Sequence, residues 1–186
     1  MNEEHLRLCS SDEWADGLKQ WIIPGALAGV ELGDDVLEVG PGPGRSTDLL
    51  REMTPRLTAV EVDPMLAEAL AARMAGTNVE VVHADATKMP FPDNRFSAAV
   101  SFIMLHHVPT TELQDLLLAE VARVLRPGAT FAGVDSLDSE EFRDLHVDDI
   151  CNPVVPDGLE ARLKAAGFAE ARVNVNPYVI EFQARR

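Results

Sequence analysis

The sequence predicts an α/β protein built on a doubly wound, mostly parallel sheet. Apolar runs typical of strands alternate with helix-like segments from residue 35 to residue 136, which is the pattern of β-α-β units. A glycine-rich loop follows the first of these strands, where sheets of this kind bind their ligands. The chain ends on "ARVNVNPYVIEFQARR", which has the pattern of two strands around a tight turn. The last strand should therefore run antiparallel to its neighbour.

The first 30 residues have the pattern of a helical segment. "SSDEWADGLKQWIIPGALAG" begins with capping residues, and Trp14, Leu18 and Trp21 then recur at helical spacing. Pro24 should break or restart this helix. The two tryptophans share a helical face in this interpretation, and we expect that face to pack in the core rather than to form a partial lid over a ligand.

The strands and helices of the sheet follow in order. The expected strands are "DDVLEV", "LTAVEV", "VEVVHAD", "SAAVSFIML" and "ATFAGVDS". The first is a continuous apolar run, as expected for a strand buried on both faces. The expected helices are "RSTDLLREM", "PMLAEALAARMA", "TTELQDLLLAEVARVL" and "DGLEARLKAAGF". The third of these helices should end at the "RPG" that follows it. Residues 137–156 are the least regular, and we expect them to form an insertion over the active face.

Length and composition indicate one domain over residues 1–186, because 46% of the 186 residues are hydrophobic, enough for a substantial core. The formal net charge of −15 should repel a polyanion, so it predicts no nucleic-acid partner. No apolar run is long enough to cross a bilayer, which predicts no membrane partner. The acidic start is not that of a secretory signal, and Cys9 and Cys151 are too few for a disulfide framework. We therefore expect a cytoplasmic protein, and the sequence leaves a homo-oligomer possible.

The loop in "VLEVGPGPGRSTDLL" is the first candidate ligand site. Gly40, Gly42 and Gly44 follow the first strand, where glycine lets the backbone approach a ligand closely and adopt a positive φ. Their regular spacing differs from the Gly-x-Gly-x-x-Gly fingerprint of dinucleotide loops, and no Lys-Ser/Thr pair follows to bind phosphate. Glu38 precedes the glycines, and an acidic residue suits a cationic ligand better than a phosphate.

Two further carboxylates follow the next strands. Glu61 ends the second strand, where a carboxylate can accept hydrogen bonds from both hydroxyls of a ribose. Asp85 follows the third strand and could accept from an exocyclic amine. His83, just before it, is expected to have a packing role. The three acids together suit a ligand with an amino group, a ribose and an adenine.

Five stretches in this order resemble class I S-adenosylmethionine-dependent methyltransferases, of the small-molecule type related to quinone-biosynthesis enzymes (the methyltransferase type 11 group). They are "LEVGPGPG", "VEVDPML", "ADATKMPFPDNRF", "VSFIMLHHV" and "EVARVLRPG". The resemblance covers Asp35 to about Val134 and the terminal helix and hairpin. Two residues depart from the family pattern: Ser97 stands where an aspartate is usual, and Ala129 where a second glycine is usual.

The resemblance implies a seven-stranded sheet of order 3-2-1-4-5-7-6 with strand 7 antiparallel, and S-adenosylmethionine as the cofactor. It implies that the glycine loop lines the methionine and ribose, that Glu61 holds the ribose hydroxyls and that Val62 packs on adenine. It also implies that Asp85 and Ala86 bind the adenine edge, and that Ser101 and Phe102 flank the methionine amino group. The expected cofactor-binding residues are Glu38, Gly40, Pro41, Gly42, Gly44, Glu61, Val62, Asp85, Ala86, Ser101 and Phe102.

The implied activity is methyl transfer from S-adenosylmethionine to a small-molecule acceptor. The sulfonium already activates the methyl group, so positioning does much of the work, and a base is needed only for a protonated nucleophile. His107 and then His106 are the candidate bases, because both follow the fourth strand; the alternative for both is a structural turn.

Other interpretations stay open from the sequence. A cofactor-binding module without catalysis, acting as a regulator or partner protein, is the alternative to the enzyme, whereas the glycine spacing disfavours a nicotinamide oxidoreductase. His146, Asp148 and Asp149 are close in sequence, but we expect a solvated loop there and no metal site.

Overall fold

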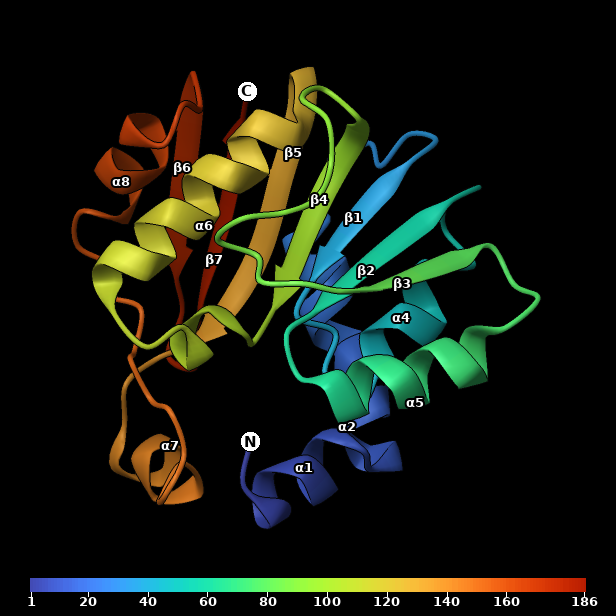
Figure 1. The fold of residues 1–186 in the computed structure, drawn as a ribbon. Helices are drawn as coiled ribbons and strands as arrows, with labels where there is room; N and C mark the ends of the chain where they lie inside the picture. The colour runs from blue at the N-terminus through green and yellow to red at the C-terminus, as the bar shows by residue number, and fades with distance from the viewer.

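The computed structural model describes residues 1–186 and contains one seven-stranded sheet with helices packed against it (Figure 1). The strand order is β3-β2-β1-β4-β5-β7-β6. Strands β1 to β5 pair in parallel, whereas β7 runs antiparallel to both β5 and β6. The predicted fold class, the strand order and the antiparallel last strand are confirmed.

The elements have the following bounds. The strands are β1 Val36–Val39, β2 Leu57–Glu61, β3 Val79–His83, β4 Phe96–Phe102, β5 Leu125–Ser136, β6 Glu170–Val175 and β7 Val179–Arg185. The helices are α1 Glu3–Cys9, α2 Asp12–Gly17, the π-helical η1 Leu18–Ile22, α3 Ile23–Ala26, α4 Arg45–Leu50, α5 Pro64–Met74, the 3₁₀ turn η2 Leu105–His107, α6 Thr111–Val124, α7 Glu140–Leu145 and α8 Leu159–Ala165. None of them has both the length and the apolar character that a bilayer-crossing helix needs.

The alternation of side chains along the strands divides the core between the two faces of the sheet. Leu37 and Val39 of β1 pack in one cluster with residues of α6 and α8. Val36, on the opposite face of the same strand, packs in a second cluster with Leu50 of α4 and with residues of η1 and α3. Because both faces are covered, β1 and β2 are buried along their whole length and β4 nearly so, as expected for the predicted β1 run.

The parallel register brings the carboxyl ends of the central strands to one edge. Val39 of β1 is level with Val60 of β2, and Glu61 of β2 is level with His83 of β3. The chain beyond each strand stays close to this edge: the N–H of Gly40 donates to the carbonyl of Val60 over 2.9 Å. Residues that follow different strands therefore share one site.

The N-terminal helices differ from the sequence expectation at the tryptophans. Trp14 is half-buried against the second core cluster, whereas Trp21 is 75% exposed. Trp14 lies in α2, whereas Trp21 lies in the π-helical segment η1, whose wider turn does not continue the α-helical face of α2. The shared face predicted for the two tryptophans is therefore wrong.

The segment 137–156 packs against the N-terminus, and α1 and α7 lie at the same end of the molecule (Figure 1). The side chain of Asn2 donates to the carbonyls of Leu145 and Val147 over 2.8 and 3.0 Å, and its backbone N–H donates to Asp149 over 3.0 Å. His146 is only 4% exposed. The expected solvated loop is thus wrong for His146, because the N-terminal segment covers it.

Candidate active site

A cavity of about 470 Å³ opens where β1, β2 and β4 end and includes the residues that follow β3. Such a volume is typical of small-molecule sites. Most of the residues that the sequence predicted for the cofactor and the base line this cavity: Gly40, Pro41, Gly42, Glu61, Val62, Asp85, Ala86, Phe102 and His107.

Four predicted residues do not line it, and their roles in cofactor binding or catalysis stay predictions. Glu38 and Ser101 are each 1% exposed, within β1 and β4. Gly44 lies past the loop, as the N-cap of α4. His106 is fully buried, and its Nδ1 lies 2.7 Å from Oδ1 of Asp135. His106 is therefore not placed to take a proton from an acceptor in the cavity.

The glycine loop has a left-handed backbone at the cavity wall. Gly40 and Gly42 have φ values of 67° and 54°, which a side chain would strain. A Cβ on Gly40 would also collide with the side chain of Met104. A Cβ on Gly42 would meet only the terminal carbon of Met1, at 3.7 Å. Gly40 is therefore needed for internal packing, whereas Gly42 opens toward the cavity.

Glu61 connects the loop to β2. Its Oε2 accepts the N–H of Gly42 over 2.9 Å, and its Oε1 accepts the N–H of Asp63 over 3.0 Å. The side chain is buried, at 6% exposed, yet it lines the cavity. Each carboxylate oxygen has a second lone pair, so Glu61 can brace the loop and still accept from two hydroxyls of a ligand.

Asp85 and Val62 form the exposed end of the cavity. Oδ1 of Asp85 accepts both the N–H and the hydroxyl of Thr87 over 2.8 Å, so Oδ2 is the oxygen that can accept from a ligand. Val62 is 64% exposed and offers an apolar surface beside it. His83 is exposed and bonds through Nε2 to the carbonyl of Val62 over 3.1 Å, so its expected packing role is wrong.

Glu38 orders the start of α4 from beneath the loop. The hydroxyls of Ser46 and Thr47 both donate to its carboxyl, the latter over 2.6 Å. Burial raises the pKa of Glu38 to about 7, and these two hydrogen bonds oppose the rise. Glu38 therefore holds the first residues of α4, directly after the loop, by hydrogen bonds made inside the fold.

Much of the remaining cavity wall is apolar and includes residues that the sequence interpretation missed. It is lined by Trp14, Leu18, Ile103, Met104, Val108, Leu113, Leu117 and Ile150. Ile103 follows β4 with a φ of 51°, which is rare for a β-branched residue. The signal for this wall is weak in the sequence, because its residues come from the N-terminal helices, the β4–α6 connection, α6 and the segment 137–156.

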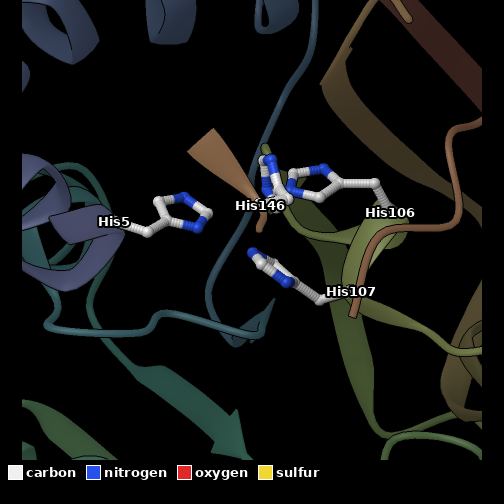
Figure 2. A group of neighbouring side chains, drawn as sticks. All are labelled: His5, His106, His107 and His146. Carbon is white, nitrogen blue, oxygen red and sulfur yellow. The ribbon is translucent and has the colours of Figure 1, made fainter. Parts of the chain in front are cut away.

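Four histidines meet beside this apolar wall, and their rings point toward one another (Figure 2). His5 comes from α1, His106 and His107 come from η2, and His146 follows α7. Burial lowers the pKa of His5 to about 4 and that of His107 to about 3, and it also lowers the pKa of His146. His107 is thus neutral near pH 7 but a weak proton acceptor.

The donor set fits S-adenosylmethionine better than a phosphate ligand. Glu61, Asp63 and Asp85 line the cavity beside an open glycine loop, and these carboxylates suit a cation with ribose hydroxyls. Arg45 also lines the cavity, but its guanidinium donates to the carbonyl of Ser10 and pairs with Asp12.

Comparison with known proteins agrees with this donor set. Residues 36–128 match the family model described as a methyltransferase domain. A probable S-adenosylmethionine-dependent methyltransferase of Mycolicibacterium smegmatis is 27% identical over 171 residues, which cover 83% of this chain and 65% of that protein. The crystal structure of an S-adenosylmethionine-dependent methyltransferase from Aquifex aeolicus superposes with a TM-score of 0.76 at 20% identity and covers 100% of this chain and 98% of its own.

A third relative corrects the expectation about nucleic acid. A probable ribosomal RNA small subunit methyltransferase A of Methanothermobacter thermautotrophicus is 35% identical over 83 residues, which are 40% of this chain and 30% of that protein. Both curated relatives are thus matched over less than two thirds of their length. A relative named for an RNA substrate means that the net charge of −15 does not exclude nucleic acid, because net charge is a property of the whole surface and recognition is local.

The family match covers the glycine loop, Glu61 and Asp85, the same residues that meet at the cavity. The chain therefore belongs to the class I S-adenosylmethionine-dependent methyltransferases, and S-adenosylmethionine is its cofactor.

Proposed function

We propose that this chain transfers the methyl group of S-adenosylmethionine to a small, largely apolar acceptor held inside the cavity. The observation that supports this most is the composition of the cavity. The wall includes the glycine loop and the carboxylates of Glu61 and Asp85, and much of the rest of it is apolar. A cofactor and an uncharged acceptor would each meet a wall of suitable chemistry.

The sulfonium of the bound cofactor supplies an electrophilic methyl group, so the task of the protein is to align the acceptor and exclude water. Glu61 would hold the ribose hydroxyls, Val62 would pack on the adenine, and Asp85 with Ala86 would bind its edge. Trp14 and Ile150 would enclose the acceptor. We do not assign proton removal to His107, because its low pKa makes it a poor base near neutral pH.

Acceptor specificity would come from the N-terminal helices and from the segment 137–156, which is the proposed insertion over the active face. Asp149 and Ile150 of that segment line the cavity, as do Met1, Cys9 and Trp14 of the N-terminal segment. These are the parts of the cavity wall that lie outside the matched methyltransferase domain.

The test uses S-adenosylmethionine labelled in its methyl group. Purified chain is incubated separately with a metabolite extract and with total RNA, and the labelled product is identified by mass. We expect label in a low-mass compound and release of S-adenosylhomocysteine. Label found in RNA alone contradicts the small-molecule acceptor. Cofactor binding without any turnover would instead favour a non-catalytic binding module.

Glu61→Gln tests the cofactor part of the proposal. Loss of a charged hydrogen-bond acceptor costs about 1.5–3 kcal/mol, so the cofactor should bind roughly 10- to 150-fold more weakly. Glu68→Gln, on the exposed side of α5, is the matched control and should bind like the wild type. Isothermal titration with S-adenosylhomocysteine measures both, and equal affinities would contradict the role of Glu61.

A further inference from the structure

We propose that His5, His106, His107 and His146 bind one divalent transition-metal ion of the zinc type beside the acceptor wall of the cavity. One ring nitrogen from each of the four lies within 4.8 Å of the others. The rings converge from three separate segments of the chain (Figure 2). Metal binding does not depend on the proposed acceptor, so either proposal can fail without the other.

Three of the four rings are held by a contact to their Nδ1 atom. Nδ1 of His106 bonds to Asp135 over 2.7 Å, Nδ1 of His107 bonds to the carbonyl of Ile150 over 3.2 Å, and Nδ1 of His146 bonds to the carbonyl of Phe142 over 2.6 Å. Carbonyl and carboxylate oxygens only accept, so each Nδ1 carries the proton. In a neutral ring that carries its proton on Nδ1, Nε2 is the unprotonated acceptor, which is the form of imidazole that ligates metals.

One ring nitrogen of each histidine has no hydrogen-bond partner in the protein. Nε2 of His106, of His107 and of His146 is buried without a hydrogen bond, and so is Nδ1 of His5. Three of the four residues are more than nine-tenths buried: His106 is 0%, His5 is 3% and His146 is 4% exposed. Buried polar atoms without partners are destabilising, and lone pairs cannot hydrogen-bond to one another. A cation placed between the rings satisfies all four at once.

The surroundings resemble the outer shell of a metal site. Asp135 is fully buried and fixes the ring of His106 through Nδ1, which is the common carboxylate–histidine arrangement behind a metal. Asp149 adds a second negative charge, with Oδ2 3.6 Å from Nδ1 of His5 and Oδ1 3.3 Å from the N-terminal ammonium. These two carboxylates would balance the charge of a divalent ion.

The donor chemistry selects the class of metal. Imidazole nitrogen suits Zn²⁺, Fe²⁺, Ni²⁺ and Cu²⁺, whereas Mg²⁺ and Ca²⁺ prefer oxygen ligands. Four neutral imidazoles at bond lengths of about 2.0–2.1 Å correspond to a tetrahedral zinc-type site. In such a tetrahedron the ligand nitrogens lie about 3.3 Å apart, so nitrogens that now lie up to 4.8 Å apart must move together by about 1.5 Å when the ion binds.

The position gives the ion a role in shaping the cavity. His107 and Asp149 line the cavity, whereas His5 and His146 belong to the N-terminal and 137–156 segments that cover it. An ion bound here would fasten these two segments to η2, next to the space proposed for the acceptor. Its loss should loosen the cover of the cavity more than the cofactor side.

The experiment is a titration of tag-free protein, stripped with a chelator, with Co²⁺ followed by visible absorbance. We expect one Co²⁺ per chain, displacement by Zn²⁺ and no displacement by excess Mg²⁺. His83→Ala is the matched control, because His83 is the one histidine outside the cluster and is exposed. It should bind as the wild type does, and the double variant His5→Ala/His146→Ala should lose stoichiometric binding.

A second variant separates metal loss from misfolding. Asp135→Asn keeps all four histidines and should weaken Co²⁺ binding by roughly 10- to 100-fold, as losses of such outer partners do. Circular dichroism and S-adenosylhomocysteine binding check the fold of each variant. The proposal is overturned if the wild type takes up no stoichiometric Co²⁺, or if the folded double variant binds Co²⁺ as tightly as His83→Ala does.

Discussion

The buried carboxyl of Glu38 gives the sharpest prediction about stability. It is 1% exposed, and its partners are the hydroxyls of Ser46 and Thr47, with no cation bonded to it. Burial raises its pKa from the ordinary value of 4.5 to about 7. Glu38→Gln removes the titration while it keeps nearly the same shape and one oxygen acceptor for the hydroxyls.

The sign and size follow from proton linkage. Between pH 4.5 and pH 7 the folded chain keeps a proton on Glu38 that the unfolded chain has released. The free energy of unfolding therefore falls as the pH rises through this window and levels off above it. The loss amounts to about 3 kcal/mol over the whole window, and to about 2 kcal/mol between about pH 5.5 and about pH 8.

The assay is urea unfolding of the wild type and of Glu38→Gln at about pH 5.5 and about pH 8. Other groups, including the buried histidines, titrate in both chains, so only the difference between the two pH dependences reports on Glu38. The wild type should lose about 2 kcal/mol more than the variant over this interval. Glu68→Gln, exposed on α5, should behave like the wild type. Equal losses in the wild type and Glu38→Gln would show that Glu38 is already ionised in the folded chain and would refute the reasoning.

Two further predictions concern the glycine loop and Ser97, which stands where the family usually has an aspartate. Gly40→Ala should destabilise the fold by about 1–3 kcal/mol, because it adds both strain at a positive φ and a collision with Met104. Gly29→Ala, with a similar φ of 73° but open space around its Cβ, should cost less, and thermal unfolding compares the two; equal costs would mean that the collision is relieved. Ser97→Ala should cost about 1–3 kcal/mol in urea unfolding, because the hydroxyl of Ser97 accepts the N–H of Asp35 and donates its one proton to the carbonyl of Leu32, over 2.6 Å, with the carbonyl of Asp35 also within reach. Wild-type stability for Ser97→Ala would mean that water replaces these bonds.

The sequence predicted the sheet and the residues that line the cavity after β1, β2 and β3, all for one physical reason. Strand and helix periodicities are local, and parallel strands place whatever follows them at a common edge. Glu61 and Asp85 could therefore be placed in the cavity from their positions after β2 and β3. The terminal hairpin likewise identified the antiparallel strand.

The alternation of side chains along β1 explains why Glu38 does not line the cavity. Glu38 is level with the ligand edge, but it shares a face with Val36, which packs on the α4 side of the sheet. Being near the end of a strand fixes the edge and not the face, so a position in the cavity wall did not follow. The alternation of Val36, Glu38 and the opposite pair Leu37 and Val39 was the available signal.

The sequence by itself determined the fold class and the order of the motifs, because both depend on local periodicity and spacing, and the resemblance of those motifs to a known family implied the cofactor. Only the tertiary structure decided what covers the cavity. The π-helical turn that exposes Trp21, the burial of His146 beneath the N-terminus and the meeting of His5 with His106 depend on contacts between segments far apart in the chain. No short pattern in the sequence specifies such contacts, because they follow from how the whole chain packs.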